Sequence, residues 1–410
     1  MPKHVVFDGG YTIESAGDDA PLAFLSYELR RVYGENIRLS VLSRHPNGDF
    51  NKYYDVTTYK NIEYRSKSES LEKWFCGLNY NDDRHELAKI ADLIADADLL
   101  VLGAGNFLTE IGIDVLRGHL PRFGVMMLMA NMAHTPCMLF GLSANKLQSP
   151  YSIRAAQWIL SNAQAVTFRE QKAIDNLIAS GVSLPSYELL PDPALGAPRS
   201  DSSRADEILS LEGIPQPKGY RLALAPRDLS WLGKNENYHE LMAGLINRWL
   251  DHNLENDVLF VPQCTYCVDS KETDDRWIAE QISRQSNFVD RIHHVNGLYP
   301  SWDVEVLYET ATVAVATRLH GSVFAARRST PVIGIAYEDK VSGFFHQLGM
   351  PEFVLPLDID VDSLFLKVIE LLQNEAEISA HLTSNVLRMQ KQLGRYTDIA
   401  IKLLESETLK

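Results

Sequence analysis

Residues 311–328, ATVAVATRLHGSVFAARR, contain the unit from which the whole fold is built. The first six residues are an apolar run of the length expected for a buried strand. A polar turn, TRLHG, follows at 317–321, and residues 322–328 then have helical character. A strand, a turn and a helix in this order form half of a βαβ unit. This segment therefore predicts a parallel sheet covered by helices.

The same alternation of strand, turn and helix occurs in both halves of the chain. Further strands are predicted at 4–8, 38–42, 99–102, 136–141, 165–168, 221–225, 258–261 and 331–336. Helical spacing is found between them at 20–33, 85–97, 238–250 and 276–283. We therefore predict an α/β protein of two doubly wound Rossmann-like domains that face a cleft.

A linker-like string, DPALGAPRSDSSRAD at 192–206, divides the two halves. We place an N-terminal domain at 1–197, with an irregular insertion at about 46–83. The C-terminal domain is placed at 205–375. A C-terminal helix at 376–410 could pack back on the first domain.

Composition narrows the class of protein further. The 410 residues carry a formal net charge of −15, which disfavours nucleic acid and anionic membranes as partners. We find no secretory signal and no apolar run long enough for a spanning helix, and we expect a cytoplasmic protein without stable membrane insertion. It could reach the inner face of the membrane through its acceptor or partners, and a homo-oligomer is compatible with the sequence.

The four cysteines do not form a disulfide framework in a chain of this length. Cys264 and Cys267 form a single C-x-x-C, which would suit a redox pair or half of a zinc site. The interpretation that we favour is two reduced thiols after a strand. We predict no metal.

Ligands of open α/β sheets bind beyond the carboxyl ends of the strands. The candidate site residues are therefore the polar residues and glycines that follow strands: Asp18, Gly103, Gly105, Asn106, Asn145 and Arg169 in the first half, and Arg227, Gln263, Arg318, His320 and Lys340 in the second. The glycines could admit a phosphate, but the sequence lacks the third glycine of the dinucleotide motif. Tight turns explain these glycines equally well.

The turn that holds Arg318 and His320 carries the most chemistry. The planar guanidinium of arginine matches a carboxylate or a phosphate, and histidine transfers protons near neutral pH. The alternative is an ion pair for Arg318 and a helix cap for His320. The position after a buried strand, with Lys340 after the next strand, favours an anion-binding site.

Several ordered motifs resemble the polysaccharide pyruvyl transferase family over nearly the whole chain. These motifs are GDD at 17–19, GAG at 103–105, GLS at 141–143, AVTFRE at 165–170, DPA at 192–194, RLHG at 318–321, and AYEDKVSGF at 336–344. The most specific are RLHG and the later Y-x-x-K. The sequence departs from the family where GAG stands in place of the common GGG.

The resemblance implies an architecture similar to the GT-B glycosyltransferases. It also implies phosphoenolpyruvate as donor, a sugar or glycan acceptor that could be lipid-linked, and no cofactor. Its motif positions give Asp18, Arg169, Arg318, His320 and Lys340 as functional candidates, to which we add Arg227 from its position after a strand. On this basis His320 would act as general acid and Asp18 as base. The alternatives are a GT-B glycosyltransferase that uses a nucleotide sugar, and a non-catalytic glycan-binding protein.

Overall fold

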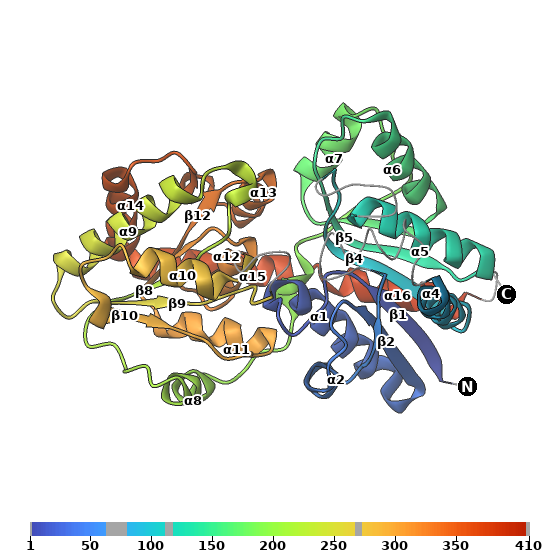
Figure 1. Ribbon diagram of the computed structural model, residues 1–410, viewed down its shortest axis with the longest axis horizontal. Helices are drawn as coiled ribbons and strands as arrows, with labels where there is room; N and C mark the ends of the chain where they lie inside the picture. Colours follow the sequence, from blue (N-terminus) through green and yellow to red (C-terminus); the bar gives the residue numbers. More distant parts are fainter. Residues whose placement is uncertain (1, 63–79, 111–117, 267–272, 407–410) are drawn as a thin grey trace. The chain divides into compact units, whose positions relative to one another are not determined.

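The computed structural model describes residues 2–62, 80–110, 118–266 and 273–406 (Figure 1). The chain divides into two compact units. The first unit contains Met1–Ile13, Asp18–Ala197 and Lys391–Lys410, and the second contains Glu14–Gly17 and Pro198–Gln390. Among the described helices, none has the length and the apolar character that a membrane-spanning helix needs.

The first unit is built on a parallel sheet with the strand order β3-β2-β1-β4-β5-β6-β7. Its strands are β1 (Lys3–Asp8), β2 (Ile37–Ser43), β3 (Thr57–Lys60), β4 (Leu99–Leu108), β5 (Cys137–Ala144), β6 (Ala165–Phe168) and β7 (Glu188–Leu189). Every residue of β5 is buried, as expected for a central parallel strand that is covered on both faces.

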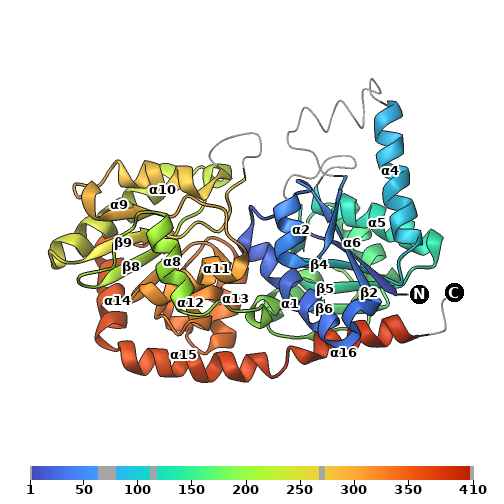
Figure 2. The ribbon, with the colours of Figure 1, turned by 90° about the horizontal axis from the view of Figure 1, so that it is seen from below.

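Helices cover both faces of this sheet. They are α1 (Ala16–Tyr33), α2 (Gly48–Tyr54), α4 (Tyr80–Ala95), α5 (His119–Ala133), α6 (Pro150–Asn162), α7 (Gln171–Ala179) and α16 (Gly394–Glu405). Apolar residues of α4 to α7 share one core with the sheet, while Tyr396 of α16 contacts Phe24 of α1 and Phe140 of β5 edge-on. Figure 2 shows α4 and α5 on one side of the strands and α16 on the other.

The prediction of an irregular insertion at 46–83 is wrong for residues 48–60, which contain a helix and a strand. Asn47 caps α2 by accepting hydrogen bonds from the backbone N–H groups of Asp49 and Phe50. Strand β3 then pairs in parallel with β2 and forms the edge of the sheet. Both elements are too short to produce a clear periodicity, which explains the error. Residues 63–79 of the predicted insertion lie outside the described residues.

Strand β4 is longer than the sequence predicts. We expect it to end before a glycine turn at residue 103, but it continues to Leu108 and pairs with β5 along most of this length. A Cβ atom on Gly103 would lie 2.0 Å from the carbonyl oxygen of Phe140. The glycine is therefore needed for the close approach of β5, and not for a turn.

The second unit contains a second parallel sheet, with the order β10-β9-β8-β11-β12-β13. Its strands are β8 (Arg221–Ala225), β9 (Asp257–Phe260), β10 (Ile292–His294), β11 (Val313–Ala316), β12 (Val332–Ala336) and β13 (Val354–Pro356). The strand order reverses between β8 and β11, which creates a topological switch point there. The predicted α/β class, with two doubly wound Rossmann-like parts, is confirmed.

The helices of the second unit are α8 (Ser203–Leu211), α9 (Asn235–His252), α10 (Asp275–Ser283), α11 (Ser301–Val306), α12 (Leu319–Arg327), α13 (Asp339–Leu348), α14 (Val361–Gln373) and α15 (Glu375–Gln390). Figure 2 shows α9 and α10 on one side of the strands and α11 and α12 on the other. Right-handed crossovers on either side of the switch point require this distribution.

The C-terminal segment, predicted as one helix at 376–410, is divided into α15 and α16. Helix α15 packs in the second unit, where Thr383 and Ser329 share a hydrogen bond of 2.7 Å. Helix α16 belongs to the first unit and buries Tyr396 and Ala400 there. The break between the two helices falls where the chain passes from the second unit to the first.

Candidate functional site

The turn after β11 brings Arg318 and His320 to the start of α12, at the switch point of the second sheet. A Cβ atom on Gly321 would lie 2.6 Å from the Cβ of Ala225 and 3.0 Å from that of Ala316. Only glycine therefore lets the first turn of α12 rest on the ends of β8 and β11. The backbone N–H of Arg318 also donates to the carbonyl of Ala225, at 3.3 Å.

Arg318 is held by a carboxylate that the sequence analysis did not select. Its Nη2 and Nε atoms donate to Asp275, with distances of 2.6 Å from Nη2 to Oδ1 and 3.1 Å from Nε to each oxygen. Asp275 is fully buried. Burial alone would lower the pKa of Arg318, but Asp275 outweighs it and the pKa lies well above its ordinary value. The ion pair that we weighed as an alternative for Arg318 is therefore present.

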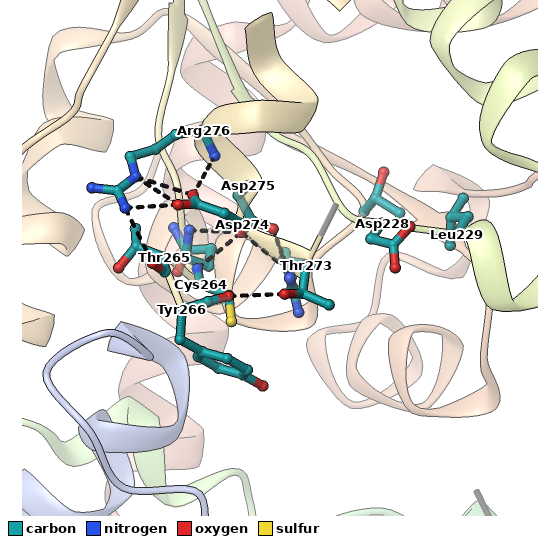
Figure 3. Close-up of polar contacts among 12 residues, drawn as sticks. Asp228, Leu229, Cys264, Thr265, Tyr266, Thr273, Asp274, Asp275 and Arg276 are labelled. Atoms are coloured by element: carbon teal, nitrogen blue, oxygen red, sulfur yellow. Dashed lines mark hydrogen bonds and ion pairs between the residues drawn. The ribbon is translucent and has the colours of Figure 1, made fainter. Parts of the chain in front are cut away.

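The carboxylate of Asp275 also binds the loop after β9 (Figure 3). Its Oδ2 accepts hydrogen bonds from the backbone N–H groups of Gln263 and Cys264, at 3.0 and 2.9 Å. Arg276 adds a hydrogen bond from Nη2 to the carbonyl of Thr265, at 3.1 Å. The start of α10 thus fixes the backbone of residues 263–265.

This loop in turn binds Glu14–Gly17, a segment that we call the strap. The strap lies in the second unit, although the chain before and after it belongs to the first. The N–H of Ala16 donates to the carbonyl of Gln263, and the N–H of Thr265 donates to the carbonyl of Glu14. A Cβ atom on Gly17 would lie 2.3 Å from Nδ1 of His320, so the strap packs directly on the imidazole.

Arg227, Tyr337 and Lys340 form a second group of site residues, after β8 and β12. The guanidinium carbon of Arg227 lies 4.4 Å from the centre of the Tyr337 ring, and Nζ of Lys340 lies 5.2 Å from it. Lys340 pairs with Glu338 at 2.7 Å. Burial lowers the pKa of Lys340, but Tyr337 and Glu338 outweigh this effect and the net shift is upward.

Arg227 differs from the other two cations of the site. No carboxylate within the described ranges pairs with its guanidinium, which rests on the face of Tyr337. Sequence reasoning selected Arg227 by its position but did not select Tyr337. The Y-x-x-K spacing was the available signal, because it places the ring between β12 and α13, and Lys340 three residues later in the first turn of α13.

Gln263 is nearly buried, and its side chain serves the fold. Its Nε2 donates to the hydroxyl of Tyr308 at 3.1 Å. Its backbone joins Asp275 and the strap, as described above. The prediction that the Gln263 side chain contacts a substrate stays a prediction.

In the first unit, Arg169 is buried among protein partners. Its Nε donates to the hydroxyl of Ser143 at 2.8 Å and its Nη1 to Asp192 at 2.9 Å, and Glu170 lies 3.4 Å away. These contacts join the ends of β5 and β6 to the turn at Asp192. Arg169 has a clear structural role, and its role towards a substrate stays a prediction.

The other candidates of the first unit fall into two places. Asn106 and Asn145 lie together, since Nδ2 of Asn106 donates to Oδ1 of Asn145 at 3.1 Å, with Gly103 and Gly105 in the preceding part of β4. Asp18 lies beside Gly10, where a Cβ atom would come 2.9 Å from its Oδ2.

No metal centre is evident among the residues that the structure describes. The described residues contain no group of three or more His, Cys, Asp and Glu side chains that could hold an ion. Cys264 is buried, and Cys267 lies outside the described residues.

Two Rossmann-like units give the chain a fold similar to that of the GT-B enzymes. The family model of the polysaccharide pyruvyl transferases matches residues 16–339, which is most of the chain, and the chain belongs to this family. The resemblance inferred from the motifs is thus confirmed. The match ends one residue before Lys340.

Three similar proteins have low sequence identity to this chain. The amylovoran biosynthesis protein AmsJ of Erwinia amylovora is 23% identical over 317 residues, which cover 75% of this chain and 73% of that protein. Anabaena HepE, solved in complex with UDP-glucose, has a TM-score of 0.62 at 11% identity and covers 98% of this chain and 99% of its own. A putative UDP-N-acetylglucosamine 2-epimerase from Listeria monocytogenes has a TM-score of 0.64 at 11% identity, with coverage of 99% and 97%. At these identities the solved structures show the fold alone.

Proposed function

We propose that this protein transfers pyruvate from phosphoenolpyruvate to two hydroxyls of a sugar and so forms a pyruvate ketal. The observation that carries the proposal is the cationic end of the second sheet. Arg227, Arg318 and Lys340 follow the neighbouring strands β8, β11 and β12, and among these three only Arg227 has no acid partner within the described residues.

The charge balance of this region suits a small anion. Asp275 and Glu338 pair with two of the three cations, which leaves the positive charge of Arg227 for a ligand. Phosphoenolpyruvate carries a phosphate and a carboxylate, and guanidinium groups bind both in a planar, bidentate manner. A protein with a net charge of −15 needs such a local cluster to attract an anionic donor.

The reaction needs a proton at the methylene carbon of the donor. His320 delivers it as general acid, and the adjacent carbon then accepts the oxygen of a sugar hydroxyl. Asp18 takes the proton of that hydroxyl. Asp18 is the next residue after Gly17 in the chain, and Gly17 packs on His320. A second hydroxyl then attacks the same carbon and gives its proton to His320, which lost its own proton in the first step, while phosphate leaves with the electrons of the C–O bond and takes up the proton that Asp18 accepted.

The acceptor is proposed as a sugar of an exopolysaccharide or cell-surface glycan precursor. The name of AmsJ, an amylovoran biosynthesis protein, supports a role in polysaccharide synthesis. A cytoplasmic location, with access to a lipid-linked acceptor at the membrane, agrees with this role and stays part of the proposal.

A second candidate is transfer of a sugar from a nucleotide sugar. The solved structures of similar fold that contain UDP or UDP-glucose favour it. The two candidates differ in their products, because only pyruvyl transfer releases inorganic phosphate from phosphoenolpyruvate and creates a ketal methyl group.

The test is a transfer assay with phosphoenolpyruvate and a panel of glycosides with neighbouring hydroxyls. We expect release of phosphate that depends on the acceptor, together with a new ketal methyl signal in the proton NMR spectrum of the product. Release of UDP from a UDP-sugar, without consumption of phosphoenolpyruvate, would instead identify a glycosyltransferase.

A further inference from the structure

We propose that Asp275 is a positioning residue for the reaction, because it orients Arg318 directly and holds the strap against His320 through the loop at 263–265. This inference rests on the proposed function for the reaction that it serves. It concerns a residue that no motif of the chain selects.

The first link runs from Asp275 to Arg318. Nε and Nη2 form one edge of the guanidinium, and both donate to Asp275. Nη1 makes no hydrogen bond within the described residues. Because the guanidinium is planar, the hydrogen bonds of Nε and Nη2 also set the direction in which Nη1 points. The Arg318 side chain keeps 16% of its surface exposed, whereas Asp275 keeps none. An arginine fixed on one edge by a buried carboxylate is already ordered before a ligand binds, so binding does not have to order it.

The second link runs from Asp275 to His320. Oδ2 of Asp275 fixes the N–H groups of Gln263 and Cys264, and the N–H of Asp275 itself donates to the carbonyl of Cys264 at 2.8 Å. Figure 3 shows this loop against the start of α10. The loop binds the strap through an antiparallel bridge between Ser15 and Cys264. Gly17 of the strap then limits the position of the His320 ring.

A matched control exists in the same unit. Asp257 accepts from Nε and Nη2 of Arg221 at 2.8 and 2.6 Å, so the same edge of an arginine meets a buried carboxylate, here with one oxygen for each donor. It lies at the first residues of β8 and β9, whereas Arg318 and His320 follow the last residues of strands. Loss of either carboxylate leaves an arginine without its buried charge partner. Only the pair of Asp275 and Arg318 belongs to the proposed site.

The first experiment compares Asp275→Asn with Asp257→Asn in the full chain. Asparagine keeps the size of the side chain but loses the charge and one acceptor. We expect Asp275→Asn to raise the KM for phosphoenolpyruvate and lower kcat, with kcat/KM reduced by about 100-fold, as a misplaced binding group causes. Asp257→Asn, if it folds, should keep kcat and the KM for phosphoenolpyruvate within about 2-fold of the wild-type values. Equal losses in both variants would overturn the proposal and indicate a general effect on stability.

A double variant separates positioning from an independent effect. If Asp275 acts through Arg318, the donor affinity of Asp275→Asn/Arg318→Ala should equal that of Arg318→Ala alone. Losses of donor affinity that multiply would contradict the link to Arg318.

Gly17→Ala tests the strap without removing any charge. Its methyl group would displace the imidazole of His320, so we expect kcat to fall at least 10-fold while donor affinity stays unchanged. An unchanged kcat would overturn the link to His320. This variant also keeps the proposal open to test if Asp275→Asn does not fold.

One measurement does not depend on the reaction. In protein labelled with 15N-arginine, the Nε–H signal of Arg318, assigned by its loss in Arg318→Lys, should exchange slowly and disappear or shift in Asp275→Asn. A signal that is the same in both proteins would refute the positioning of Arg318 even if pyruvyl transfer is correct. If the wild-type protein neither binds nor consumes phosphoenolpyruvate, the proposed function fails, and this signal still decides whether Asp275 orients Arg318.

Discussion

The guanidinium of Arg227 rests on the ring of Tyr337, 4.4 Å from its centre, and Lys340 approaches the same ring to 5.2 Å. Two cations that share one aromatic ring repel each other, and the negative face of the ring offsets part of that repulsion. An anion that binds to Arg227 would offset it further. The pair of Arg227 and Tyr337 is therefore central to the account of donor binding.

Tyr337 should act through its ring and not through its hydroxyl. The hydroxyl is buried and makes no hydrogen bond in the described part of the chain. Tyr337→Phe keeps the ring face, so the Kd for phosphoenolpyruvate should stay within about 2-fold, whereas Tyr337→Ala should raise it about 10-fold through loss of the cation–π contacts. Calorimetry on both variants checks this. A large loss in Tyr337→Phe would show that the hydroxyl binds the donor.

His320 should be needed for turnover and not for donor affinity. Because it supplies a proton in the reaction, His320→Gln should lower kcat by about 100-fold or more. The Kd for phosphoenolpyruvate should change little. The control is His252→Gln, at the end of α9 and away from the strand ends that carry the site. If His320→Gln instead loses donor binding but retains kcat at saturation, the imidazole is a binding group and the proposed general acid lies elsewhere.

Arg169 should contribute to stability because of its buried partners. Arg169→Met leaves Asp192 buried without its cation, so the free energy of unfolding should fall by about 3–5 kcal/mol. Urea unfolding followed by circular dichroism measures the change. The control, Arg154→Ala on the exposed side of α6, should stay within about 0.5 kcal/mol of wild type. If Arg169→Met has normal stability but binds substrate more weakly, Arg169 is a substrate-binding residue, as its motif position predicts.

Much of the fold follows from the sequence because buried parallel strands and their turns are encoded locally. An apolar run that ends at a polar turn precedes each of Arg227, Arg318 and Lys340. The structure has a strand at each of these three runs. Neighbouring strands of a parallel sheet then bring these residues to one edge. The helix at 48–54 and the edge strand at 57–60 escaped detection because each is too short for a periodic signal.

The features missed at the site depend on contacts between distant segments. Asp275 pairs with Arg318 from a helix 43 residues earlier in the chain, and the strap meets residues more than 240 positions away. The acidic pair at 274–275 reads equally well as the ordinary start of a helix, because carboxylates are favoured there. Only the folded chain shows that one of the two carboxylates caps α10 while the other holds Arg318.

Calorimetric titration of phosphoenolpyruvate into the wild-type protein and into Arg227→Ala, with UDP-sugars titrated in parallel, decides whether the cationic end of the second sheet binds the donor. We predict saturable binding of phosphoenolpyruvate to the wild type and a loss of at least 10-fold in Arg227→Ala, since no acid in the described residues pairs with this guanidinium. Binding of a UDP-sugar alone, or phosphoenolpyruvate binding that Arg227→Ala leaves intact, would contradict this prediction.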